Sequence, residues 1–148
     1  MGLFEQGTTT IKARDIKLEP AEAFAAIALI AVAADDVITE SEKQGINNML
    51  SCMKLFSNYS EERKREMLDR LLEIIKNKAI KPLFDAAVAK IPQELNETVF
   101  AVSTDLVLID GELAEEEEQL LNELYNALEI SEAVATKIID VMMIKNKG

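Results

Sequence analysis

Two short groups of carboxylates are the part of this sequence with the greatest potential for chemistry. In each group an Asp ends an apolar segment and a Glu follows seven residues later, and the second group is offset from the first by 75 residues. The acidic residues concerned are Asp35, Asp36, Glu42, Asp110, Glu112 and Glu117. Carboxylate oxygens suit hard cations such as Ca²⁺, Mg²⁺ and Mn²⁺. We therefore predict that the two groups converge and bind one divalent cation, with Ca, Mg, Mn and Zn as the candidates.

The same carboxylates also have a purely structural interpretation. Thr39 and Glu42 have the spacing of a helix capping box, and each Asp can accept hydrogen bonds from the helix that follows it, which makes a tight corner between two helices. Because Ca²⁺ takes about 6–8 oxygen ligands, one group alone is too small a site. An EF-hand is excluded, since Leu106 and Leu108 occupy positions where that loop needs carboxylates.

The composition excludes several classes of enzyme. The chain has no His, which removes imidazole bases and His-ligated metals. Cys52 is the only Cys, so neither an intrachain disulfide nor a Cys-rich zinc site can form. Its neighbours Leu50 and Met53 favour a thiol that packs near the core. We therefore expect no enzymatic activity; a hydrolase that uses metal-bound water is the weakest alternative.

The net charge of −11 is concentrated in one segment. Residues 91–136 contain twelve acidic residues and no Lys or Arg, which leaves fifteen of the 27 acidic residues and all sixteen basic ones in the remainder. Such a surface repels phosphate, so we expect no nucleic-acid partner. It attracts cations or basic protein surfaces. The main alternative to a cation site is therefore a protein-interaction module with an acidic docking surface.

Twelve consecutive apolar residues at 23–34 raise the question of a membrane segment. The run is shorter than the roughly 20 residues that span a bilayer. Acidic residues lie directly before it, and a related apolar helix recurs later in the chain, which argue against a signal peptide. We predict a buried helix and no direct insertion into a membrane.

Apolar periodicity predicts an all-α fold, a compact array of about seven helices, with no competing strand pattern. Expected starts are marked by Pro20, Thr39, Ser60, Pro82, Pro92 and Ser131. Helices at 20–35 and 92–110 are apolar nearly all round, so both are expected to be central. The segment 61–66 is expected to be a solvated, mixed-charge face. Residues 1–19 are expected to form a mobile arm, and 20–148 a single domain.

The repeated pattern predicts an internal duplication. Two helix pairs would pack with pseudo-two-fold symmetry, which would bury the two apolar helices against each other and bring the acidic groups together. Asp105 lies within one of these apolar helices. We expect it to face solvent, to pair with a base from the near-neutral half, or to line the same site.

An Ala-rich apolar helix followed by Asp-[Gly/Asp]-x-[Ile/Leu]-x-x-x-Glu, present twice over about residues 20–145, resembles the TerB-like tellurite resistance family. The second copy, from Asp110-Gly111 to Glu117, follows the pattern closely, whereas the first has Asp36 where Gly is usual. The resemblance implies a cytoplasmic stress-response protein that acts beside partner proteins, some of them membrane-associated. It also implies metal binding by Asp35, Glu42, Asp110, Glu112 and Glu117.

Overall fold

The computed structural model describes residues 11–33, 38–109 and 113–147, and within these ranges it contains α-helices, short 3-10 turns and no strand. The seven helices are α1 (Pro20–Ala33), α2 (Glu40–Ser51), α3 (Glu61–Lys76), α4 (Ile80–Lys90), α5 (Asn96–Val107), α6 (Glu115–Ala127) and α7 (Glu132–Lys145). The 3-10 turns are η2 (Ala13–Asp15), η3 (Lys54–Phe56) and η4 (Gln93–Leu95). The predicted all-α class is confirmed.

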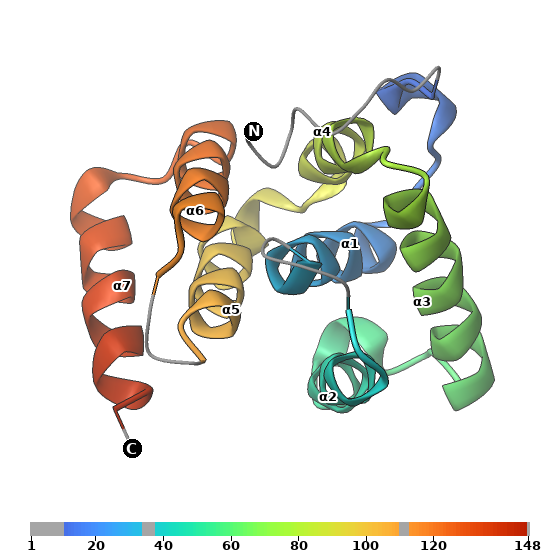
Figure 1. The fold of residues 1–148 in the computed structure, drawn as a ribbon, viewed down its shortest axis with the longest axis horizontal. Coiled ribbons are helices and arrows are strands. Elements are labelled where there is room, and N and C mark those ends of the chain that lie inside the picture. Colours follow the sequence, from blue (N-terminus) through green and yellow to red (C-terminus); the bar gives the residue numbers. More distant parts are fainter. Residues whose placement is uncertain (1–10, 34–37, 110–112, 148) are drawn as a thin grey trace.

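Helix α1 forms the centre of the molecule. It packs against α2, α3, α4 and α5, which surround it in Figure 1. Every residue from Ala23 to Ala31 is buried, because this stretch has no polar side chain to direct toward water. Its many Ala side chains are short and allow α4 and α5 to approach closely. The all-round apolar pattern thus correctly marked a core helix.

Side chains cap three of the helices as the sequence predicted. Thr39 Oγ1 accepts a hydrogen bond from Glu42 N at 3.1 Å, and Ser60 Oγ accepts one from Arg63 N at 3.0 Å. Ser131 Oγ accepts a third from Val134 N at 3.2 Å. Each bond satisfies one of the backbone donors that a helix leaves free at its start. These caps fix where α2, α3 and α7 begin.

Two local predictions were wrong. Pro92 does not open the fifth helix, because its backbone is extended (ψ 138°) and the turn η4 intervenes before α5 begins at Asn96. Lys64 is not solvated but only 3 % exposed. Its ammonium donates to Glu61 Oε1 at 2.6 Å and to the hydroxyl of Ser51, which lies at the end of α2. The Lys64 hydrogen bond lowers the pKa of Glu61.

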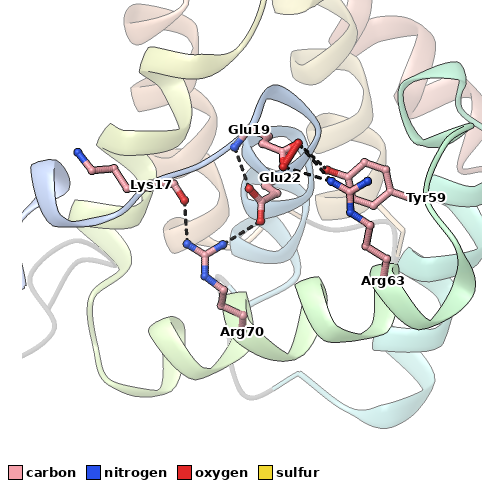
Figure 2. Close-up of polar contacts among 6 residues, drawn as sticks. All are labelled: Lys17, Glu19, Glu22, Tyr59, Arg63 and Arg70. Atoms are coloured by element: carbon pink, nitrogen blue, oxygen red, sulfur yellow. Dashed lines mark hydrogen bonds and ion pairs between the residues drawn. The ribbon is translucent and has the colours of Figure 1, made fainter.

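A polar network clamps α3 to the start of α1 (Figure 2). Arg70 donates to Glu22 Oε2 at 2.8 Å and to the carbonyl of Lys17 at 2.7 Å. Arg63 pairs with Glu19 at 3.2 Å, and its guanidinium lies 3.8 Å from the centroid of the Tyr59 ring, a cation–π contact. The network therefore fixes the direction in which the chain enters α1.

The segment that precedes α1 also contributes to the core. Ile16 and Leu18, which belong to the arm inferred from the sequence, are both buried. In the described part of the chain, no helix combines the length and the apolar character needed to cross a bilayer.

Helix α7 lies at one edge of the array, where it packs on α5 (Figure 1). Only Ala135 is fully buried in it, and the apolar residues of the side that faces α5 are half-buried, namely Val134, Ile138, Ile139 and Met142. Its opposite face exposes Val141, Met143 and Ile144. The helix therefore carries apolar side chains both on the side that packs on α5 and on the side that is exposed to solvent.

Candidate functional site

A cavity of about 530 Å³ lies where the two helix pairs meet. The ends of α1 and α5, most of the length of α2 and the first turn of α6 form its walls. Its lining residues are Ala31, Val32, Ser41, Glu42, Gly45, Ile46, Met49, Asp105, Leu106, Val107, Ile109 and Glu117. Two of the six predicted ligands, Glu42 and Glu117, thus reach one cavity although 75 residues separate them in the chain.

Glu42 and Glu117 make the same local hydrogen bond. Each is the third residue of its helix, and its Oε1 accepts from the backbone N–H three residues earlier, in Thr39 and Ala114 respectively, at 2.9 Å in both cases. The first turn of a helix is also where the helix dipole favours negative charge. The cap that the sequence predicted for Glu42 is therefore present, and Glu117 makes the equivalent bond at the start of α6.

Their burial differs. Glu117 is only 5 % exposed, whereas Glu42 is exposed. A carboxylate removed from water is unstable unless hydrogen bonds or cations compensate for the lost hydration. Because Glu117 is shielded from water, its charge depends more on neighbouring hydrogen bonds and cations than the charge of Glu42 does.

Asp105 is the third carboxylate of the cavity. Its Oδ1 pairs with Lys145 Nζ at 3.0 Å and accepts a hydrogen bond from Asn146 Nδ2 at 2.9 Å. Asp105 therefore meets two of its expectations together, because it pairs with a base and lines the site. Its bonds also attach the end of α7 to α5.

The remaining predicted ligands, Asp35, Asp36, Asp110 and Glu112, lie outside the described residues. Within the described ranges, no three carboxylate or thiol groups lie close enough to hold a metal ion. Glu42, Glu117 and Asp105 thus share a cavity without forming a ligand set of their own. A cation there would need further oxygens.

The cavity also has features that the motif did not indicate. Most of its wall is aliphatic, contributed by Ala31, Val32, Ile46, Met49, Leu106 and Val107. Ser41 and Gly45 line it one turn apart on α2, on the face that also carries Ile46. That helical spacing was readable in the sequence, but nothing in it showed that the face borders a cavity. An apolar wall lowers the local dielectric and strengthens any interaction with the carboxylates.

Cys52 is not part of this site. It caps the end of α2 and is exposed, so the prediction of a thiol packed near the core was wrong. The buried residue of that turn is Leu50, which belongs to the hydrophobic core.

Comparison with known proteins identifies no relative that shares this site. No protein-family model matches the chain, and neither the curated proteins nor the solved structures include a significant match to it. The function must therefore be inferred from the residues of the chain and their arrangement in the structure.

Proposed function

We propose that this protein is a non-enzymatic module that binds a divalent cation at the junction of its two helix pairs and acts with partner proteins in a stress response. The observation that carries the proposal is that Glu42 and Glu117, from the two copies of one sequence pattern, line a single cavity. Asp105 adds a third carboxylate to the same wall. Ca²⁺, Mg²⁺, Mn²⁺ and Zn²⁺ are the candidates, and the first three match an all-oxygen site.

The proposed ligands of the cation are the six carboxylates of the repeated pattern. Glu42 and Glu117 supply carboxylates from the start of each second helix, and Asp35, Asp36, Asp110 and Glu112 complete the set from the two connecting segments. Their combined charge, together with the absence of Lys or Arg from 91–136, favours a cation over an anion such as tellurite. The resemblance to the TerB-like family supports a cytoplasmic stress role with other proteins as partners, some of them membrane-associated.

Calorimetric titration with each of the four metals tests the cation site. We expect binding to the wild type and its loss in the double variant Asp110→Asn/Glu117→Gln, because two ligand carboxylates become neutral. The matched control is Glu62→Gln/Glu66→Gln, which removes the same charge from the exposed face of α3 and should bind as the wild type does. A wild type that binds none of the metals at millimolar concentration, or a double variant that binds normally, would overturn the proposal.

The acidic segment favours one other function, that of a docking module for a basic protein. Twelve acidic residues and no base lie between 91 and 136, and the first turn of α6 holds four of them, of which Glu115 and Glu118 are exposed. Such an association weakens steeply as salt screens the charges. A partner recovered by pull-down at low salt and retained unchanged at high salt would contradict this function.

A further inference from the structure

We propose that the outer face of α7 pairs with the same face of a second copy of this chain, as a weak antiparallel two-helix dimer. The starting observation is the exposure of large apolar side chains on this helix. Val141 is 56 %, Met143 52 % and Ile144 67 % exposed. Contiguous exposed apolar residues on one helix mark interaction surfaces more often than isolated ones do.

The position of α7 leaves this face open. The helix packs on α5 through its inner face, and Figure 1 shows no other described element on its outer side. Asp105 and Asn146 hold its C-terminal end against α5. A rigid helix at the edge of the molecule can therefore present its outer residues to another molecule without rearrangement.

The spacing of the outer residues is that of a coiled-coil seam. Ala133, Lys137, Asp140 and Ile144 are all exposed, and they follow one another at intervals of four, three and four residues. Alternating steps of four and three keep side chains in line along one side of a helix, where they insert between side chains of a partner helix. Val141 and Met143 flank this line on its two sides.

The opposite charges of Lys137 and Asp140 favour a second copy of the chain as the partner, with the two helices antiparallel. With the two-fold axis placed between Ile138 and Ile139, Lys137 of each copy lies opposite Asp140 of the other, and Ala133 lies opposite Ile144. Two symmetric ion pairs form, and each small side chain meets a large one. Moving the axis onto Lys137 or onto Asp140, or making the helices parallel, places identical charges opposite each other. Polar residues within such a seam commonly fix register in this way.

Neither charged residue of the seam is engaged within the described structure. Lys137 and Asp140 form no ion pair with another described residue, although six such pairs occur elsewhere. The nearby Lys145 is different, since it pairs with Asp105 on the inner side. The two seam charges therefore remain available to a partner without breaking an existing contact.

The size of the surface sets the expected affinity. A helix of 14 residues is about 21 Å long, and one helix pair of that length buries less than the roughly 1,600 Å² of a standard stable interface. We therefore expect a reversible dimer with a dissociation constant in the micromolar range or weaker. Sedimentation equilibrium of the full chain over a wide concentration range measures it directly.

Charge exchange between two variants tests the register. Lys137→Glu alone and Asp140→Lys alone should each weaken self-association about tenfold or more, because two attractive contacts become repulsive. A one-to-one mixture of these variants should recover association, since each unlike pair is restored between different copies. The double variant Lys137→Asp/Asp140→Lys should also recover it.

The control for these variants is a charge reversal at a site far from α7. Lys76→Glu, a charge reversal on the exposed end of α3, should leave self-association unchanged, and circular dichroism establishes that every variant remains folded. A wild type that stays monomeric at millimolar concentration would overturn the proposal. So would single variants that associate as the wild type does, or a mixture that associates no better than its components.

Discussion

The two helix pairs of this protein begin from nearly the same sequence pattern and arrive at different environments. In the α1–α2 pair, Thr39 and Glu42 form a reciprocal cap with exposed side chains. In the α5–α6 pair, Ala114 lacks a hydroxyl, and Glu117, which makes the same backbone bond, is buried. Local hydrogen bonding is thus repeated, whereas burial is set by what packs on each corner. A repeated motif does not imply a repeated physical role.

The largest expected difference between the two corners is in the cost of deleting the Glu. Glu117→Ala should lower the free energy of unfolding by about 2–3 kcal/mol, because it empties buried volume and leaves the N–H of Ala114 without this acceptor. Glu42→Ala should cost about 1 kcal/mol, since water replaces the lost contacts at an exposed cap.

Urea unfolding of both Glu variants, followed by circular dichroism in the presence of a chelator, compares these values without a contribution from bound metal. Equal losses in the two variants, or a larger loss for Glu42→Ala, would show that burial does not separate the corners.

A smaller effect concerns the residue that precedes each of these helices. Thr39→Ala should destabilise the protein by about 1 kcal/mol, and Ala114→Ser should stabilise it by about 0.5–1 kcal/mol, because a hydroxyl there accepts a backbone hydrogen bond. Thermal unfolding measures both changes. Thr98→Ala, at an exposed position in α5, is the control for a Thr that caps no helix. A destabilising Ala114→Ser would mean that the α6 corner has no space for the cap.

The smallest expected effect is on the stability of the protein at alkaline pH. It arises in the polar network between α3 and the start of α1, which the α5–α6 pair does not share. Partial burial, and then the charge of Glu19, raise the pKa of Tyr59 above its ordinary value of 10.0, although Arg63 opposes the shift. The folded state therefore holds the phenolic proton more tightly than the unfolded state does. The stability from this group is complete below pH 10 and is lost as the pH rises through the folded-state pKa.

Ultraviolet absorbance of tyrosinate, titrated in the wild type and in Tyr59→Phe, separates Tyr59 from Tyr125. Unfolding measured across the same pH range should show a steeper decline for the wild type than for Tyr59→Phe. Identical declines would indicate that the phenol of Tyr59 does not contribute to the alkaline loss of stability.

The sequence predicted those elements whose cause is local. Thr39, Ser60 and Ser131 cap helices because their hydroxyls reach backbone groups only three residues away, and α1 was recognised as central because it has no polar face. Where the outcome depends on distant parts of the chain, prediction failed. Lys64 is buried because the end of α2 receives its ammonium, and no feature of its own helix indicates that contact.

The candidate site shows the same division. The carboxylate pattern was visible in the sequence, and so was the possibility that Asp105 lines the site. The aliphatic wall of the cavity and the unequal burial of Glu42 and Glu117 depend on how four helices meet. The apolar periodicity of a single helix does not show how these four helices pack around the cavity.

The enclosure of α1 has a practical consequence for measuring this protein. Amide hydrogens in a helix surrounded on all sides exchange with solvent mainly when the whole domain opens. A peptide from residues 20–33, followed by mass spectrometry during deuterium exchange, would therefore report the global opening free energy. The chain contains no Trp, so unfolding cannot be followed by Trp fluorescence. Deuterium exchange in α1 can be used instead to follow global unfolding.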